Sequence, residues 1–423
     1  MNILWVKMGG LWPPTSGGRT RSLQLISELS RRHTVTVVTT HGAGDDPAGL
    51  VARLPRCERI FSFEYRVPKR GSAAFVSALA RSWASADPVD LWKWRVPDVR
   101  SAVHSLIGAG DIDVCVADFL FAVNNVPLGG KTPVALFEHN VEHLIWKRLC
   151  DLERVPWRRA LLEIEWRKMR AREAAACRRA DMTIAVSQAD AERLADLAPG
   201  ANIEWMPTGV DVDYFSPSPF ESQERPGHLV FSGSMDWHPN EDAVRYFMSD
   251  ILPLIRASRP DTTFSIVGRN PSAELRRVAA ASAAEVTGTL DDIRPAVAQA
   301  ALCVVPLRAG SGTRLKIFEA LAMGKAVVST TLGAEGLSME SGRHFVAADG
   351  ARNFADAVIG LLRDDDRRRR IAAAGRALVE ARYSWAQVAL PFERHCQDAA
   401  DSHATIRTAT RRHPHLSPAR SAR

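Results

Sequence analysis

A glycine-rich turn between an apolar run and a helix-like run carries the densest set of residues suited to binding an anion. The segment VVPLRAGSGTRLKIFEALAMGKAVVSTT spans residues 304–331, and its pattern predicts a strand, a turn, a helix and a second strand. Ser311 and Gly312 lie in the turn, and we interpret Thr313 as the N-cap of the helix. Backbone N–H groups at such a helix start, together with the helix dipole, favour bound phosphate. The turn therefore predicts a diphosphate site.

Three charged side chains follow that turn. Arg314 and Lys316 place positive charge in the first turn of the helix, where cations oppose the dipole, and a bound diphosphate would explain their position. Glu319 comes one turn later, where a carboxylate is well placed to accept hydrogen bonds from two ribose hydroxyls. An ordinary strand–helix–strand unit with a charged helix surface fits the same pattern, and the pattern alone does not separate the two interpretations.

Glycines and polar residues also follow several other predicted strands. Ligands of open parallel sheets bind at the carboxyl ends of the strands, so these positions are candidates for the same or a neighbouring site. Each one alone is more often a turn than a ligand contact, but together they surround the glycine-rich turn. They are Gly17 and Gly18, Gly233, Arg269 after Gly268, and Thr287.

A histidine ends the predicted strand at residues 134–137. His139 stands in LFEHNVEH, where it could donate to a sugar hydroxyl or stabilise developing charge. The same residues spell H-x-x-E-H, with Glu142 and His143, a zinc-peptidase pattern. That pattern needs a helix to bring both histidines to one face, whereas here a strand runs straight into His139. We therefore predict no metal site, and a structural histidine remains the alternative.

Strand-like and helix-like runs alternate along the whole chain, which predicts an α/β fold with parallel, doubly wound sheets. Residues 206–219 (MPTGVDVDYFSPSP) interrupt the alternation and indicate a linker between two series. Strands are expected at 2–8, 34–39, 114–117, 134–137, 182–186, 229–231, 263–267, 285–287, 302–306 and 327–329. Helices are expected at 19–32, 144–179, 188–197, 242–257, 272–281, 293–300, 314–323, 351–362, 364–382 and 385–400.

The length of 423 residues exceeds what one core usually supports. We predict two Rossmann-like domains, residues 1–207 and 208–383, whose strand ends face a cleft. Residues 384–400 are expected to form a helix that packs back toward the first domain. Residues 401–423 are expected to be a disordered basic tail.

Charge and cysteine usage limit the class of protein. The net charge is +7 and the pI is about 9.3, which suits anionic substrates or an anionic membrane surface as well as a solvated basic face. The six cysteines are scattered without a C-x-x-C pair, as in a reducing compartment. The start has no basic stretch followed by a long apolar run, and no run of 18 apolar residues occurs. We expect a cytoplasmic protein.

With these residues identified, the chain resembles a family 4 glycosyltransferase of the GT-B fold, in the bacterial polysaccharide-assembly branch. The most specific shared string is GSGTRLKIFEALAMGKAVVST. Supporting strings are the glycine pair after the first strand, FEHN, AVSQAD, PTGVD, FSGSMDWHPN and VTGTLDD. The resemblance as a whole covers about residues 1–400.

This resemblance implies a retaining transfer of a sugar from a nucleoside diphosphate sugar to an acceptor hydroxyl. Residues 1–207 would hold the acceptor and residues 208–383 the donor. No metal and no other cofactor would be required, because side-chain cations and helix termini would neutralise the diphosphate leaving group. A phosphate oxygen would accept the proton of the hydroxyl that attacks from the side on which the diphosphate leaves.

The resemblance also implies roles for individual residues. Gly17 and Gly18 would lie against the donor phosphates and the acceptor, and His139 would contact the transferred sugar near its reacting centre. Glu319 would bind the ribose. Donor binding would further involve Gly233, Arg269, Thr287, Ser311, Gly312, Thr313, Arg314 and Lys316.

The chain departs from the family pattern in three places. Ser311 stands where many members carry a second glutamate, and Thr208 where an asparagine is common at the linker. Ser234 and Asn240 stand in the region where many members place an arginine and a lysine. Our hypothesis is that Arg314 and Lys316 supply the missing positive charge.

The residues of the predicted acceptor-binding domain say less about function than those of the predicted donor domain. Basic residues mixed with Trp and Leu in 69–95 and 144–170 fit helices lying on an anionic bilayer, which suits a lipid-linked acceptor and a peripheral location at the inner face of the membrane. Ordinary helix packing with a solvated basic face is the alternative. Other functions left open are a sugar-nucleotide epimerase and a non-catalytic nucleotide-sugar binder. A nucleic-acid binder is not favoured, because no known reader motif organises the basic residues.

Overall fold

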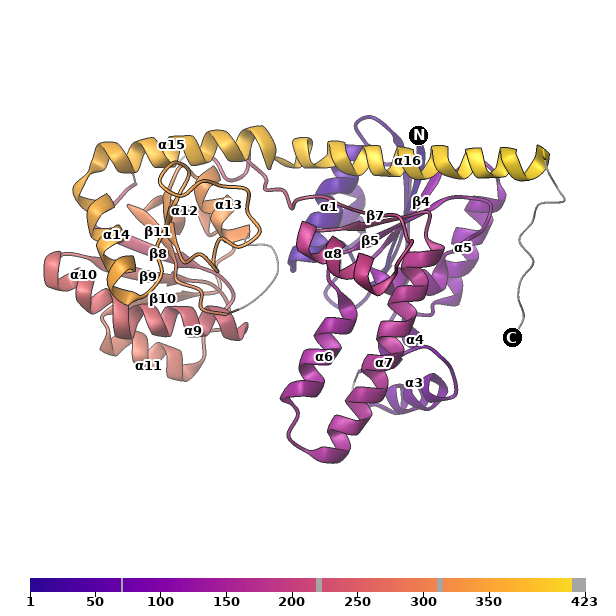
Figure 1. Ribbon diagram of the computed structural model, residues 1–423, viewed down its shortest axis with the longest axis horizontal. Helices are drawn as coiled ribbons and strands as arrows, with labels where there is room; N and C mark the ends of the chain where they lie inside the picture. The colour runs from indigo at the N-terminus through magenta and orange to yellow at the C-terminus, as the bar shows by residue number, and fades with distance from the viewer. Residues whose placement is uncertain (70, 218–222, 310–314, 413–423) are drawn as a thin grey trace. The chain divides into compact units, whose positions relative to one another are not determined.

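The chain forms two compact α/β units, as a computed structural model that describes residues 1–69, 71–217, 223–309 and 315–412 shows. Unit 1 comprises Met1–Pro207 and the chain from Ala389, and unit 2 comprises Thr208–Val388. Each unit is built on one parallel sheet with helices packed against it (Figure 1). The predicted fold class is confirmed.

The sheet of unit 1 has seven parallel strands in the order β3-β2-β1-β4-β5-β6-β7. The order reverses between β1 and β4, which is the topological switch point where ligands of doubly wound sheets bind. Lys7 at the end of β1 lies opposite Asp118 at the end of β4. The strands are β1 Asn2–Lys7, β2 Thr34–His41, β3 Arg59–Glu64, β4 Val114–Asp118, β5 Val134–Glu138, β6 Met182–Ala185 and β7 Ile203–Trp205.

The sheet of unit 2 has six parallel strands in the order β10-β9-β8-β11-β12-β13. This order repeats that of unit 1, so the switch point lies between β8 and β11. The strands are β8 His228–Ser232, β9 Thr263–Val267, β10 Ala284–Gly288, β11 Leu302–Val305, β12 Ala326–Ser329 and β13 Val346–Ala347. Strands β3, β7 and β13 were not predicted, because they lie at sheet edges and carry mixed or short apolar patterns.

Helices connect the strands in both units. In unit 1 they are α1 Gly17–Leu29, α2 Pro47–Arg53, α3 Ala73–Trp83, α4 Val89–Trp92, α5 Pro97–Gly108, the 3₁₀ turn η1 Leu120–Asn125, α6 Glu142–Leu152, α7 Pro156–Arg179 and α8 Gln188–Leu197. In unit 2 they are α9 His238–Tyr246, a π-helical segment Phe247–Ile251, α10 Leu252–Ser258, α11 Ala273–Ala281, α12 Arg294–Ala298, α13 Leu315–Ala322, α14 Ala351–Arg363 and α15 Asp365–Arg382. Helix α16, Trp385–Arg412, begins in unit 2 and continues in unit 1.

Two predicted helices differ from the structure in their continuity. The region predicted as one helix over 144–179 is the antiparallel hairpin of α6 and α7: α6 ends at Leu152, and α7 begins at Pro156, a residue suited to the first position of a helix. The helix predicted at 242–257 starts earlier, at His238, and contains the π-helical segment. Neither difference moves a predicted site residue.

Helix α16 is longer than predicted. It runs to Arg412, whereas we expected the helix to stop at residue 400 and the chain beyond it to be disordered, so that expectation is wrong for residues 401–412. The apolar periodicity ends near residue 400, but His403 contacts the Asp181 carboxylate at 2.8 Å and the Lys131 carbonyl at 3.1 Å. Earlier in α16, Phe392 packs against the rings of Trp5 and Phe137.

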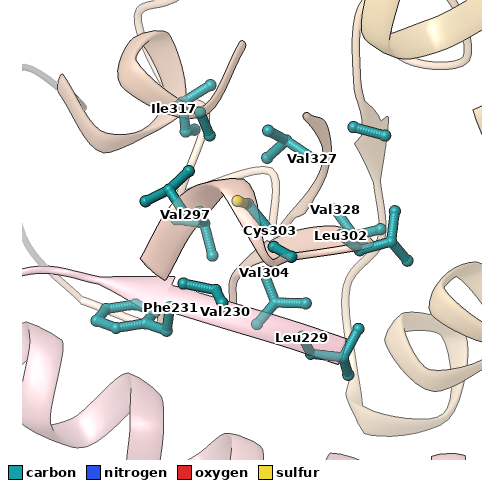
Figure 2. Close-up of a cluster of buried hydrophobic side chains, with 14 of the residues drawn as sticks. Leu229, Val230, Phe231, Val297, Leu302, Cys303, Val304, Ile317, Val327 and Val328 are labelled. Carbon is teal, nitrogen blue, oxygen red and sulfur yellow. The ribbon is translucent and has the colours of Figure 1, made fainter. Parts of the chain in front are cut away.

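Packing in the hydrophobic core of unit 2 places the first turns of α13 beside the switch point between β8 and β11. Leu229, Val230 and Phe231 of β8 pack with residues of β11 and β12 and with Ile317 of α13 (Figure 2). All are buried, and close packing of this kind fixes the residues that follow each strand. Among the helices that the structure describes, none is long and apolar enough to cross a bilayer.

Candidate functional site

The switch point of unit 1 carries a buried group of charged side chains. The Lys7 ammonium lies 3.6 Å from the Asp118 carboxylate, and the other Asp118 oxygen lies 2.8 Å from Nε2 of His139. Arg21 of α1 approaches the opposite ring nitrogen, Nδ1, at 2.9 Å. All four side chains are buried. We call these four residues the unit 1 group.

The ring of His139 has a charged neighbour at each of its two nitrogens within this group. A guanidinium only donates, so Nδ1 accepts from Arg21 and the proton resides on Nε2, facing Asp118. Burial lowers the pKa of His139 to about 3, against the raising influence of Asp118. The imidazole is therefore neutral at pH 7. Nε2 faces the Asp118 carboxylate at 2.8 Å, so a hydrogen bond from Nε2 to a sugar hydroxyl would have to compete with that contact, and the proposed role of His139 stays a prediction.

The neighbouring charges in the unit 1 group keep the Asp118 carboxylate ionised. Burial raises the pKa of Asp118, but Lys7 and His139 outweigh it and hold that pKa at about 2. Burial lowers the pKa of Arg21 to about 10 and also lowers the pKa of Lys7. Two basic side chains and one carboxylate thus meet where β1 and β4 end, an arrangement suited to an anionic ligand nearby.

Gly18 brings the start of α1 against this group. A Cβ on Gly18 would lie 2.6 Å from Cζ of Phe119 and 3.6 Å from Nδ1 of His139, so only glycine fits. Ser16 caps the helix by accepting from the backbone N–H of Arg19, which leaves Gly17 and Gly18 in its first turn. Phe119 stacks on His139 with ring centroids 3.7 Å apart and has a φ of 71°. Left-handed backbone at a non-glycine residue is strained and often marks functional sites.

The opposite face of the end of β5 carries a second polar cluster. The Glu173 carboxylate accepts from the backbone N–H groups of Glu142 and His143 and contacts Nδ1 of His143 at 2.6 Å. Burial and the neighbouring carboxylates raise the pKa of Glu138 well above its usual range, and burial raises the pKa of Glu142 to about 7. His139 and His143 therefore have different partners and share no helix face. Within the described ranges, no group of three or more His, Cys, Asp or Glu residues is arranged to hold a metal ion.

The switch point of unit 2 is built from glycines in close contact. Gly233 follows β8 and Gly268 follows β9, and a Cβ on Gly268 would lie 1.8 Å from the carbonyl oxygen of Gly233. The Gly233 N–H donates to the Val267 carbonyl at 2.9 Å. A Cβ on Gly233 would lie 2.8 Å from both Nζ of Lys316 and Nδ2 of Asn240. The two loops and the first turn of α13 are thereby packed together.

Lys316 and Glu319 of α13 lie at this switch point. The Lys316 ammonium donates to Oδ1 of Asn240 at 2.6 Å and lies 4.0 Å from the ring centroid of Phe231. Burial raises the pKa of Glu319 to about 7, with Lys316 opposing the shift. Glu319 and Lys316 are both half-buried. We call Gly233, Asn240, Lys316 and Glu319 the unit 2 group.

The remaining predicted donor-site residues differ in their placement. Nε of Arg269 donates to Oγ of Ser234 at 2.9 Å, so Arg269 belongs beside the unit 2 group. Thr287 lies on the edge strand β10, two strands from β8, and its hydroxyl donates to the Gly288 carbonyl. No contact in the described structure joins Thr287 to the unit 2 group. Ser311, Gly312, Thr313 and Arg314 lie outside the described residues.

The sequence analysis missed three members of the unit 1 group, Lys7, Asp118 and Arg21. The signal was present for two of them, because a charged residue closes the apolar runs NILWVK and VCVAD. A charge at the end of a buried strand rarely occurs without a partner. Arg21 gave no such signal, since an arginine in the first turns of a surface helix is common.

Comparison with known proteins agrees with this architecture. Residues 15–214 match the family model "Glycosyltransferase Family 4" and residues 226–364 match "Glycosyl transferases group 1". A phosphatidyl-myo-inositol mannosyltransferase of Mycobacterium tuberculosis is 34% identical over 223 residues, which cover 50% of this chain and 58% of that protein. A GDP-mannose-dependent alpha-(1-6)-phosphatidylinositol monomannoside mannosyltransferase of the same species is 30% identical over 48% of this chain and 58% of its own length.

A solved structure shares the fold over nearly the whole chain. The glycosyltransferase from Rickettsia africae superposes with a TM-score of 0.63 at 14% identity, covering 94% of this chain and 98% of that one. The curated relatives, by contrast, are matched over little more than half of their length. Taken together, the two family models and the shared fold show that this chain belongs to glycosyltransferase family 4 and has the GT-B fold.

Proposed function

We propose that the chain transfers a glycosyl group from a nucleoside diphosphate sugar to a hydroxyl of a glycan or lipid-linked acceptor, with retention of configuration and without a metal ion. In this reaction the bond between the anomeric carbon and the diphosphate oxygen breaks, and a bond from the acceptor oxygen forms on the same face. The acceptor proton passes to the departing diphosphate oxygen. Family membership and the relatives' names as mannosyltransferases support transfer of this kind.

The observation that carries the proposal is the position of Lys316. Its ammonium lies at Asn240, the region where many family members place a cation, and lies against Gly233, where no side chain fits. A cation beside an open backbone loop suits the two phosphates of a donor, and a preorganised charge of this kind stabilises the departing diphosphate. Lys316 thus takes over a charge that the loop after β8 lacks. Arg314, which we proposed for the same role, remains a proposal.

Glu319 would bind the ribose of the donor. Its carboxylate lies one turn from Lys316 on α13, and the pKa of about 7 means that it is partly protonated at neutral pH. The ionised form accepts hydroxyl hydrogen bonds more strongly than the protonated form does, and such bonds would in turn lower its pKa. Donor binding would therefore favour loss of this proton.

The unit 1 group would form the acceptor-side part of the site. Gly17 and Gly18 would let a ligand approach the start of α1, where Arg21 and Lys7 provide positive charge. His139 would contact the transferred sugar near its reacting centre, and Asp118 and Arg21 would hold the ring in place. The protein would act at the cytoplasmic face of the membrane in the synthesis of a cell-surface glycan, with a glycolipid or polysaccharide acceptor.

A thermal-shift panel tests the donor site. We would compare UDP, GDP, ADP, CMP and dTDP, each with and without EDTA, and follow the responding sugar nucleotide by NMR to identify the anomer formed. A ligand at about 100 times its dissociation constant adds about 2.7 kcal/mol of stability, a shift of several degrees. We expect one diphosphate to respond regardless of EDTA, with GDP a leading candidate given the named relative. No response to any nucleotide, or product of inverted configuration, would overturn the proposal.

A further inference from the structure

Asn240 is a buried amide that joins the loop after β8 to helix α13. It lies in the first turn of α9 and is 4% exposed. Its Nδ2 donates to the Ser234 carbonyl at 2.8 Å, and its Oδ1 accepts from the Lys316 ammonium at 2.6 Å. Because a carbonyl only accepts and an ammonium only donates, these two partners fix the orientation of the amide.

The amide offsets an unfavourable position of Lys316 in its helix. Lys316 is the second residue of α13, where a cation opposes the helix dipole. Its ammonium also lies 4.0 Å from the ring centroid of Phe231, which is buried in β8 (Figure 2). A Cβ on Gly233 would lie 2.8 Å from the same Nζ, so only bare backbone fits on that side. The amide, the ring and the glycine backbone thus hold the ammonium in one place.

A neutral partner leaves the positive charge of Lys316 in force. An amide oxygen accepts a hydrogen bond without cancelling the charge of the ammonium, whereas a carboxylate at the same place would form an ion pair with it. A lysine side chain has many rotamers, and fixing it in advance removes part of the entropy cost of binding a ligand. Asn240 therefore orients the cation without neutralising it, which is what a preformed site for an anion requires.

We propose that Asn240 is a positioning residue for the diphosphate of the donor and that it acts through Lys316. It stands in the region where the family pattern places a cation, and here an amide in that region receives the cation of α13 instead. Glu319 comes three residues after Lys316 on the same helix, so α13 would set the spacing between the phosphate contact and the ribose contact. This role rests on the proposed donor site, and it adds the residue that holds the charge of that site in place.

The variant Asn240→Asp tests this role, because it keeps the size of the side chain and adds a negative charge beside Lys316. We would titrate GDP, UDP, ADP and dTDP, and the nucleoside of each, into the full chain by calorimetry. For the diphosphate that binds the parent, affinity should fall about tenfold or more in Asn240→Asp, while affinity for its nucleoside should stay within about twofold.

Asn353→Asp is the matched control. Asn353 is the third residue of α14, as Asn240 is of α9, and its Nδ2 also donates to a backbone carbonyl, but it is exposed. The same chemical change is therefore made at the same place in a helix of unit 2, away from Lys316. This variant should bind the diphosphate like the parent.

An exchange of the two residues gives a second measurement. The double variant Asn240→Lys, Lys316→Asn keeps an amide beside an ammonium with their positions reversed. It should recover diphosphate affinity to within about threefold of the parent, whereas Lys316→Asn alone should not. Thermal unfolding of each variant shows whether it is folded.

The outcomes separate this role from the donor site itself. Parent-like diphosphate affinity in Asn240→Asp would overturn the role and leave the donor site standing. Equal losses for diphosphate and nucleoside would also overturn it, because they would place Asn240 in the packing of unit 2. So would a folded exchange variant that binds no better than Lys316→Asn alone. If no diphosphate binds the parent chain, the proposed donor site fails together with the role of Asn240.

Discussion

Units 1 and 2 share the same strand order at their switch points, but the charged side chains that the structure describes there differ in burial. In unit 1, Lys7, Asp118, Arg21 and His139 are buried and contact one another. In unit 2, Lys316 and Glu319 are half-buried, and burial holds the pKa of Glu319 near neutrality. The same topology thus carries a buried network of charges in one unit and a half-buried lysine and glutamate in the other.

This difference indicates that the charged side chains at the two switch points are suited to different roles. A closed network of charges is costly to disturb, because removing one partner leaves the others buried without compensation. Such a network is suited to holding the His139 ring and the loops after β1 and β4 in fixed positions. Lys316 and Glu319 are half-buried, so a ligand can replace the water molecules around them. The switch point of unit 2 is therefore the one suited to ligand binding. The comparison can be tested at one residue in unit 1 and two in unit 2.

The largest effect is expected from Asp118→Asn. The substitution removes the carboxylate that contacts Lys7 and His139, and breaking a buried ion pair typically costs about 3–5 kcal/mol. Urea unfolding should show that loss. The control is Asp113→Asn, at the exposed start of the same strand, where the change should stay within about 0.5 kcal/mol. A variant of unchanged stability that has lost turnover would show that Asp118 serves in ligand contact, and would remove the contrast between the units.

A smaller effect, confined to ligand binding, is expected from Lys316→Ala. Loss of a charge-assisted contact to phosphate should weaken nucleoside diphosphate binding about tenfold, measured by calorimetry. Binding of the nucleoside alone should barely change. Lys316→Arg should retain most of the affinity, and Arg343→Ala, in an exposed pair with Glu340, serves as the surface control. Equal losses for diphosphate and nucleoside would place Lys316 in the packing of unit 2 rather than in the phosphate site.

The smallest effect is a pH dependence of nucleotide binding. Because burial holds the pKa of Glu319 at about 7, the ionised fraction of its carboxylate grows as pH rises from 6 to 8, and the proposed hydrogen bonds from ribose hydroxyls would strengthen with it. Affinity should rise a few-fold over that range, and Glu319→Gln should be weaker and without the rise. His139 should contribute nothing there, since its pKa lies at about 3. A rise of the same size in the glutamine variant would assign the titration to another group.

Much of the fold could be predicted from local sequence. The strand at 263–267 and the helix at 188–197 have the predicted bounds, because β-branched runs and a serine N-cap are local signals. Edge strands and the break between α6 and α7 were missed, since short or mixed patterns and a proline within a charged run do not settle how far an element extends. Gly233, Lys316 and Glu319 were predicted as neighbours, and the structure brings them together, whereas Thr287 lies two strands away.

The sequence by itself determined the α/β class, the two series of elements and the residues that follow their strands. Periodicity and turn chemistry act over a few residues, and those can be followed along the chain. Only the tertiary structure decided that Lys7 and Asp118, 111 residues apart, lie side by side and that Arg21 and Asp118 lie at the two ring nitrogens of His139. Pairing of strand ends depends on the order of strands in the sheet, and that order is set by packing of the whole unit rather than by any local segment.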